Sequence, residues 1–210
     1  MAPGTNIFMQ PGSSFATALN THGNCRHVIV QGARIYGGID LRGSGHVIKN
    51  CYIINGPTNV GAIELSEMGP SLEMEIVANT FHIFNPHFEG GTIMSGKDSE
   101  FTIDSDAIPS HLIFNDNTVY IRNAAAGAGP LFRLEDTLTK NTNIGYFEFC
   151  RNKFIFTVTP TSIPAWFGMS FKANFIRVQD NFATHGILGA WNTGFTHSFK
   201  SGNFVNGSEI

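Results

Sequence analysis

Acidic side chains at alternating positions are the first candidates for chemistry in this chain. Asp40 and Glu64 each stand between two apolar residues, and Glu135 follows the apolar pair Phe132 and Leu134. Residues spaced by two share one face of a strand, so these carboxylates would face away from the apolar pairs. Neighbouring strands lie about 4.8 Å apart, and a retaining glycosidase uses two carboxyl groups about 5 Å apart. Asp40 and Glu64, with Glu135 as a third suspect, are therefore the catalytic candidates if the protein is an enzyme. A solvated strand with surface charges gives the same pattern.

Groups that could bind a metal or a cofactor are poorly arranged. The segment DSEFTIDSD (98–106) holds four carboxylates but no glycine at a fixed ligand position, which favours a solvated loop over a calcium site. His82 and His87 flank a turn without a third ligand, which is typical of structural or surface histidines. The glycine-rich 124–130 segment opens no helix and lacks the lysine of a phosphate loop. The sequence therefore predicts no metal and no cofactor.

Composition sets the broad class of the protein. The chain has 210 residues, 42% of them hydrophobic, which suits one domain with a full core. Only 14% are charged and the net charge is −3, so no basic face favours nucleic acid. No apolar segment reaches the roughly 18 residues that span a bilayer. The start lacks a basic and apolar leader, and the three cysteines have no metal-ligand spacing. We expect no signal peptide, no membrane partner and free thiols.

Asparagine interrupts the apolar pattern at regular places. Asn79 has Met74 and Ile76 five and three positions before it, and Phe81 and Ile83 two and four positions after it. The same spacing recurs, complete or in part, around five asparagines: Asn50, Asn79, Asn117, Asn152 and Asn181.

The spacing itself indicates a bend at each asparagine. The step from three before to two after is five, an odd number, so a straight strand would send the two apolar pairs to opposite faces. Both pairs can face one core only if the backbone bends between them. Asparagine tolerates the left-handed conformation that such a bend needs. We therefore interpret the five asparagines as a structural ladder of bends.

A third strand completes each unit, with apolar residues such as Ile39 and Leu41, or Ile63 and Leu65, after a glycine-rich turn. This three-strand unit resembles the right-handed parallel β-helix of the pectate-lyase-like superfamily, which includes pectin-degrading enzymes and phage tailspikes. The resemblance implies an all-β fold, a right-handed single-stranded parallel β-helix of about seven coils over 27–205. An antiparallel sandwich is the alternative, and the recurring odd step disfavours it.

The ends are expected to differ from the coils, within a single domain over 1–210. The segment PGSSFATALNTHG (11–23) has a serine N-cap, spaced apolar residues and a glycine stop, which predicts a short helix. An N-terminal arm and capping helix over 1–26 would cover the open end of the core, as is common in this superfamily. Residues 206–210 form the tail.

The resemblance leaves two functions open. The catalytic motifs of the polygalacturonase type (Asn-Thr-Asp, Asp-Asp, Gly-His-Gly, Arg-Ile-Lys) do not occur in the sequence. We therefore expect a non-enzymatic phage virion protein assembled in the host cytoplasm, either a capsid decoration or cement-like protein or a small receptor-binding spike. The alternative is a polysaccharide-cleaving enzyme, a glycoside hydrolase or lyase, free or tail-attached.

Large apolar side chains exceed the inward positions in the C-terminal third. Buried at an interface, they would build a homotrimer of β-helices packed side by side. The other partners expected are virion proteins of the capsid or tail and a host-surface glycan. The phenylalanines without an inward position, which form the predicted interface, are Phe175, Phe182, Phe195, Phe199 and Phe204.

Overall fold

The computed structural model describes fifteen ranges of the chain, and every regular element in them is a strand. No helix long and apolar enough to cross a membrane occurs in these ranges. The described residues are 6–8, 14–15, 19–20, 26–36, 39–42, 45–55, 63–66, 73–83, 101–103, 110–121, 132–134, 144–159, 165–167, 173–189 and 195–210.

The strands form three sheets, here called sheets 1, 2 and 3 in the order in which the chain visits them. Sheet 1 runs in the order β1 (Asn6–Phe8), β4 (Ile29–Gln31), β7 (Val47–Lys49), β10 (Glu73–Val77), β13 (His111–Asn115), β16 (Ile144–Cys150), β19 (Ala173–Gln179) and β22 (Phe195–Ser201). Sheet 2 runs β2 (Ser14–Phe15), β5 (Arg34–Tyr36), β8 (Tyr52–Asn55), β11 (Thr80–Ile83), β14 (Thr118–Ile121), β17 (Lys153–Phe156), β20 (Phe182–Ala183), β23 (Phe204–Val205) and β24 (Ser208–Glu209). Sheet 3 runs β3 (Leu19–Asn20), β6 (Ile39–Arg42), β9 (Ile63–Ser66), β12 (Phe101–Ile103), β15 (Phe132–Leu134), β18 (Ala165–Phe167) and β21 (Ile187–Gly189).

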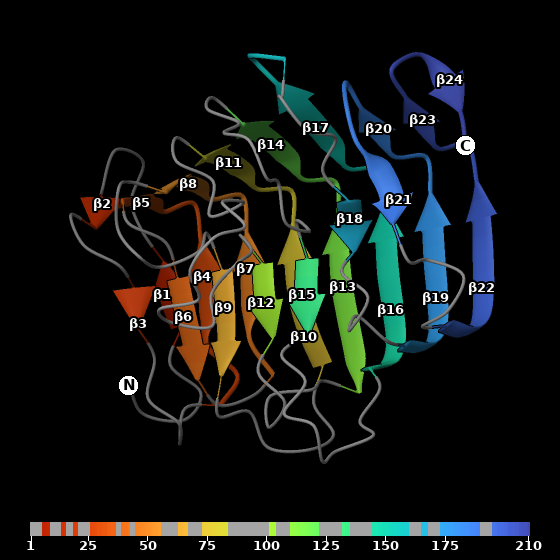
Figure 1. Ribbon diagram of the computed structural model, residues 1–210. Helices are drawn as coiled ribbons and strands as arrows, with labels where there is room; N and C mark the ends of the chain where they lie inside the picture. Colours follow the sequence, from red (N-terminus) through yellow and green to blue (C-terminus); the bar gives the residue numbers. More distant parts are fainter. Residues whose placement is uncertain are drawn as a thin grey trace, which may run out of the picture.

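Apart from β23 and β24, neighbours within a sheet are three strands apart in the chain, so each circuit adds one strand to every sheet. The pairings are parallel except between β23 and β24, which run antiparallel. Successive circuits therefore stack side by side, with the first strands at one end and the last strands at the other (Figure 1). The arrangement is all-β with parallel sheets and is compatible with a β-helix-like fold.

The core lies between the sheets and contains the apolar positions that flank each bend. Around Asn79, the side chains of Met74, Ile76, Phe81 and Ile83 are at most 3% exposed. The corresponding residues of neighbouring circuits stack in register along the core. Phenylalanine rings continue the stack, with centroids 6.1 Å apart for Phe81–Phe114, 5.7 Å for Phe114–Phe149 and 5.8 Å for Phe149–Phe154. These offset rings bury large apolar surface and fix the spacing of the strands.

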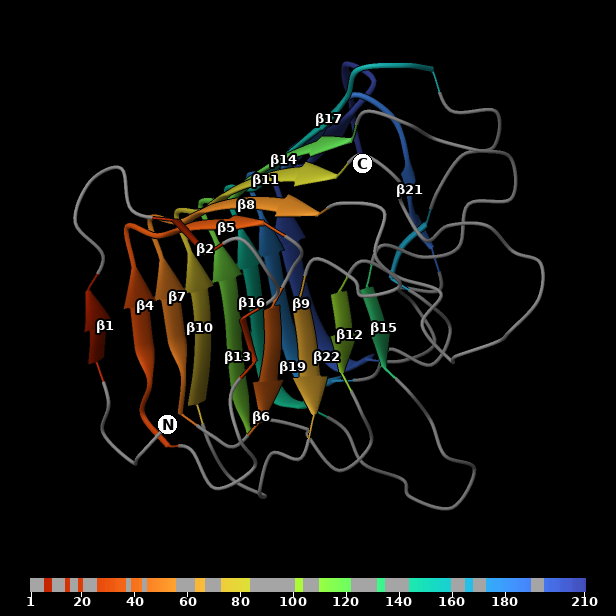
Figure 2. The same cartoon turned by 90° about the vertical axis from the view of Figure 1, so that its left-hand side faces the viewer.

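Sheets 1 and 2 meet at a sharp corner after each strand of sheet 1 (Figure 2). At each corner, the residue with the left-handed conformation stands immediately before the buried asparagine. These residues are Ala78 with φ 55°, Asp116 with 59°, Arg151 with 56° and Asp180 with 55°. The prediction that the asparagine itself takes the left-handed conformation is therefore wrong for Asn79, Asn117, Asn152 and Asn181, and holds only for Asn50, with φ 54°. Asparagine is instead the next residue, whose amide reaches the backbone of the neighbouring circuits.

The predicted helix over 11–23 is wrong for the residues described there. Ser14–Phe15 and Leu19–Asn20 are strands β2 and β3, which pair in parallel with β5 and β6. A short segment gains little from its own helical hydrogen bonds, whereas the exposed edges of β5 and β6 offer a complete set of partners. Tertiary pairing therefore overrides the local capping signals.

The C-terminal residues close the end of sheet 2. The chain turns at Asn206 and Gly207, and β24 pairs back on β23. The Ile210 N–H donates to the Asn203 carbonyl at 2.8 Å. Residues 206–210, predicted as a tail, thus occupy the edge on which a further parallel strand would otherwise pair.

Candidate functional site

A column of buried asparagine side chains runs along the corner between sheets 1 and 2. The Asn79 backbone N–H and Nδ2 both donate to Asn117 Oδ1, at 2.9 and 3.1 Å, and Nδ2 also donates to the Ile48 carbonyl at 3.0 Å. The same set of bonds links the next members: Asn117 to Asn152, Asn152 to Asn181, and Asn181 to Asn203. Each amide satisfies buried backbone groups of neighbouring circuits, which is a structural role.

Asn50 is not a member of this column. Tyr52 pairs with Thr80, so Cys51 is the residue level with Asn79, and the Cys51 N–H donates to Asn79 Oδ1 at 2.9 Å. Asn50 is exposed and left-handed, with φ 54°. The spacing in the sequence aligned Asn50 with Asn79, whereas in the structure Asn50 is level with Ala78. Asparagine suits both the left-handed position and the column, so its presence at 50 did not distinguish between them. Burial raises the pKa of the Cys51 thiol, which keeps it protonated and unreactive.

The carboxylate candidates are brought together only in part. Asp40 on β6 pairs with Glu64 on β9, so the two lie on adjacent strands of sheet 3. The same row continues through Thr102 and Arg133 on β12 and β15. Glu135 lies outside the described residues, as do all four acidic residues of the 98–106 segment; only the strand Phe101–Ile103 of that segment is described.

Of the two histidines considered as metal ligands, His82 and His87, the structure describes only His82. His87 lies outside the described residues. His82 is 8% exposed and packs between two tyrosines, with ring centroids 4.9 Å from Tyr52 and 4.8 Å from Tyr120. The described part of the chain contains no group of three histidine, cysteine or acidic residues that could hold a metal ion.

Exposed aromatic side chains gather on the last two circuits, on two different sheets. Phe175 and Phe199 on sheet 1 are 51% and 58% exposed, and Phe182 and Phe204 on sheet 2 are 40% and 41% exposed. Phe195, the fifth predicted interface residue, lies at the start of β22 and pairs with Ala173. An exposed phenylalanine has no polar group to hydrate, so a cluster of them indicates a surface that another molecule covers.

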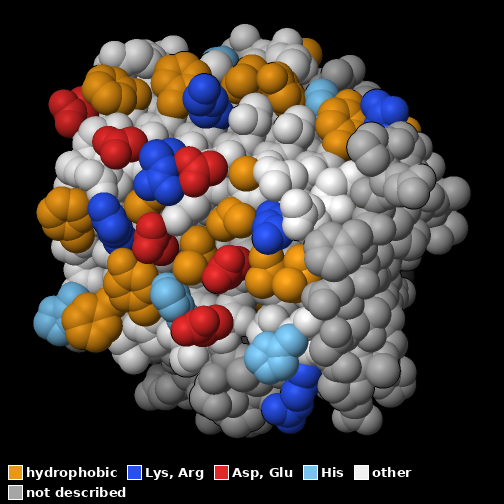
Figure 3. Space-filling model, turned by 180° about the vertical axis from the view of Figure 1, so that it is seen from behind, with side chains coloured by type: hydrophobic (Ala, Val, Ile, Leu, Met, Phe, Trp, Pro, Cys, Tyr) orange, Lys and Arg blue, Asp and Glu red, His pale blue; other side chains and the backbone are white. Residues whose placement is uncertain are grey.

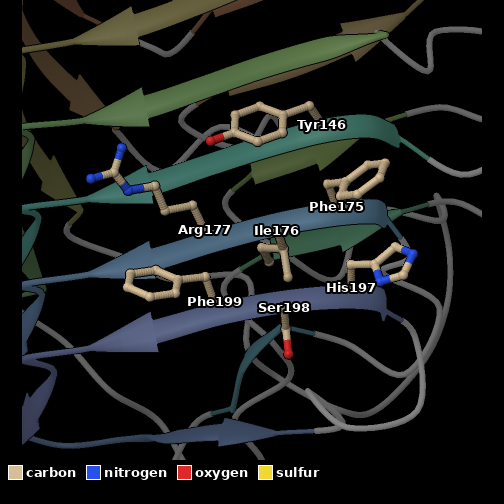
Figure 4. A pocket seen from close by; sticks show the side chains of 7 residues that line it. All are labelled: Tyr146, Phe175, Ile176, Arg177, His197, Ser198 and Phe199. Atoms are coloured by element: carbon tan, nitrogen blue, oxygen red, sulfur yellow. The ribbon is translucent and has the colours of Figure 1, made fainter.

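The sheet 1 part of this cluster borders a shallow groove of about 380 Å³. Tyr146, Arg177, Phe175, His197 and Phe199 line it from β16, β19 and β22 (Figure 4). The Phe175 and His197 rings stack, with centroids 4.8 Å apart. Seen from behind, the face around it mixes apolar, charged and histidine side chains (Figure 3).

Arg177 is the cation of the groove and is held in place by its neighbours. Its Nε and Nη2 donate to Gln179 Oε1 at 3.0 and 2.7 Å. Burial raises the pKa of Tyr146, and the Glu148 carboxylate raises it further, whereas Arg177 lowers it. Glu148 is itself fixed, because its Oε1 accepts a 2.8 Å hydrogen bond from Asn115 Nδ2. The residues that line the groove therefore supply aromatic rings and one positioned guanidinium, without a pair of carboxylates.

Sequence reasoning missed Tyr146, Arg177 and His197 as neighbours of the phenylalanines. Their signal was available: Arg177 stands between the inward residues Ile176 and Val178, so alternation places it outward. The asparagine column also gives their register, because Tyr146, Phe175 and His197 stand six positions before Asn152, Asn181 and Asn203 and pair in one row.

Comparison of the chain with protein-family models, with curated proteins and with solved structures found no match.

Proposed function

We propose that the three parallel sheets form a right-handed parallel β-helix of about seven coils. Among the described residues, sheet 3 has seven strands, one for each complete circuit, and β22 and β23 begin a further circuit, which supports this count. Right-handedness follows from the general rule for connections between parallel strands of one sheet, which are right-handed in about 98% of cases.

On this fold we propose a non-enzymatic structural protein on the surface of a phage particle, a capsid decoration or cement-like protein or a small receptor-binding spike. The phage particle is inferred from the sequence resemblance. The homotrimer is inferred from one observation on the structure. Large aromatic side chains stay exposed at the same two circuits of two sheets. Such a surface suits a homotrimer fixed to other virion proteins in the capsid or tail. If the protein is a receptor-binding spike, its ligand is a host-surface glycan.

Light scattering at micromolar concentration tests the assembly. A homotrimer has a mass near 69 kDa, three times the 22.9 kDa of one chain. A mass of 22.9 kDa at all concentrations would reject it. The setting is tested separately, by probing purified phage particles with an antibody to this chain. Particles that lack the protein would contradict the virion proposal whatever the oligomeric state.

A polysaccharide-cleaving enzyme is the second candidate, because Asp40 and Glu64 occupy adjacent strands in register. Two carboxylates at strand spacing suit the acid and the nucleophile of a retaining hydrolase. We expect no release of reducing ends from capsule, lipopolysaccharide or pectin. If turnover is found, and Glu64→Gln abolishes it while Glu209→Gln on β24 does not, the enzyme reading replaces the structural one.

A further inference from the structure

Two outward-facing rows of side chains lie on either side of the corner between sheets 1 and 2. Height here means the position along the direction in which the circuits stack, and the members of the two rows lie at equal heights. Row 1, on sheet 1, consists of Glu148, Arg177 and Phe199, which are successive partners in the register. Row 2, on sheet 2, consists of Lys153, Phe182 and Phe204, which are also successive partners. Each member of row 1 precedes its counterpart in row 2 around a single bend, so the two rows share the same three circuits.

The rows are complementary member by member. The first level sets the Glu148 carboxylate against the Lys153 ammonium, and Lys153 has no ion-pair partner among the described residues. The second level sets the Arg177 guanidinium against the Phe182 ring, a cation–π combination. The third sets Phe199 against Phe204, an aromatic pair. Opposite charges and matched rings at each level are what two surfaces in contact require.

Within one chain these rows cannot meet, because they lie on different sheets on either side of the corner (Figure 2). A second copy can bring them together. Rotation about an axis parallel to the stack leaves every height unchanged, so it carries row 1 of one copy level with row 2 of the next. A contact between two different surfaces closes into a ring when the rotation is cyclic.

A twofold dimer through row 1 alone is disfavoured by its charges. A twofold axis that centres row 1 on itself brings Arg177 against Arg177, whether the strands of the two copies run parallel or antiparallel. The same operation on row 2 leaves Lys153 without an acidic partner. Like charges placed opposite each other are destabilising, so the self-contact loses what the mixed contact gains.

We propose that row 1 of one protomer binds row 2 of the next, so that the homotrimer is built from one repeated heterologous contact: Glu148 to Lys153, Arg177 to Phe182 and Phe199 to Phe204. This inference rests on the proposed trimer and deepens it, because it assigns the two surfaces and their register. The occupant of the sheet 1 groove is thus a second copy of this chain.

Cross-linking between cysteines tests the pairing. All variants carry Cys25→Ser, and Cys51 and Cys150 remain because both are buried. The double variant Glu148→Cys/Lys153→Cys, treated with a short bismaleimide, should give a covalent trimer on a denaturing gel. Each single variant should stay a single chain, because its cysteine then has no partner across the contact. Phe199→Cys/Phe204→Cys repeats the test one level along in case the first pair weakens folding.

The outcomes separate the pairing from the trimer itself. Covalent dimers from a single variant would indicate a twofold contact and overturn the inference. A mass near 69 kDa by light scattering without any cross-link would place the interface elsewhere, which overturns the inference while the proposed trimer stands. A monomer by light scattering overturns both.

Charge reversal gives a second measure that does not depend on sulfur chemistry. Glu148→Lys or Lys153→Glu alone should raise the concentration at which the trimer dissociates by about two- to fivefold, the size expected for an exposed pair. The double reversal Glu148→Lys/Lys153→Glu should recover part of this loss, because it restores the opposite charges across the contact but not the hydrogen bond from Asn115 to Glu148. Additive losses in the double variant would show that the two residues do not meet.

Discussion

Each buried asparagine amide replaces the hydrogen bonds that the backbone loses at a corner. Asn117 Nδ2 donates to the Ile76 carbonyl at 2.8 Å, and its Oδ1 accepts from the backbone and the side chain of Asn79. An apolar side chain of similar size would leave these groups unsatisfied in the core. Buried polar groups without partners cost about 1–3 kcal/mol each.

We therefore expect Asn117→Val to lower the free energy of unfolding by about 3 kcal/mol or more. Asn50→Gly is the matched control, because Asn50 is exposed and left-handed and glycine adopts that conformation readily. Its free energy of unfolding should stay within about 0.5 kcal/mol of the wild type. Urea unfolding measures both, and equal losses would contradict the assignment of the column.

The sequence spacing located the column because its members combine a rare polar residue with fixed apolar neighbours. Asn79, Asn117, Asn152 and Asn181 could be aligned in this way, and their flanking apolar residues fill the core. Asn50 was misaligned by one residue, since both corner positions accept asparagine. The same alignment also sets Tyr146 and Phe175 in one row, because they stand six positions before Asn152 and Asn181. His197 stands six positions before Asn203 and was missed because the predicted ladder ended at Asn181.

Strands of sheet 1 approach the preceding connections closely enough to restrict side chains. On β16, a Cβ added at Gly145 would clash with the backbone carbonyl oxygen of Ser110. The same carbonyl accepts a 2.8 Å hydrogen bond from the Tyr146 N–H, so it cannot move away without breaking the ladder. Glycine at this place is required by the spacing of β13 and β16.

Gly145→Ala should accordingly lower the free energy of unfolding by about 2–3 kcal/mol, as overpacking against a fixed backbone does. Gly207→Ala is the control: its Cβ would meet nothing within 4 Å, and only the left-handed φ of 78° is strained. That control should cost about 1 kcal/mol. Thermal unfolding of the two variants decides, and a smaller loss for Gly145→Ala would mean that β16 can shift.

The local patterns predicted the strands on either side of each corner, yet they predicted a helix where β2 and β3 lie. Ser14 and Leu19 carry capping and spacing signals that suit a helix in isolation. In the folded chain these residues face the open edges of β5 and β6. A helix prediction made from the 11–23 segment alone takes no account of the strand edges of β5 and β6, because those strands lie further along the chain.

The last described strands carry two features that oppose end-to-end pairing with a second copy. On β22, Ser198 and Lys200 continue the rows of the buried residues Ile176 and Val178, so polar side chains stand where the core ends. On sheet 2, β24 runs antiparallel along β23 and occupies its edge. Inward charges and covered edges are the devices by which sheets avoid end-to-end pairing.

Removal of both features should therefore allow copies of the chain to pair end to end. A chain truncated after Asn206 with Lys200→Val loses β24 and gains an apolar side chain next to the exposed end of the core. The β22 and β23 edges can then pair with β1 and β2 of a second copy, a head-to-tail contact that does not close and so grows as a fibre. Electron microscopy and light scattering at increasing concentration should show filaments for this variant and a constant mass for the wild type. The truncation without Lys200→Val is the control and should give shorter or fewer filaments, since the charge alone still opposes stacking. If the double change leaves the mass constant, the C-terminal residues do not limit the assembly, and the limit must lie at the β1 end of the stack.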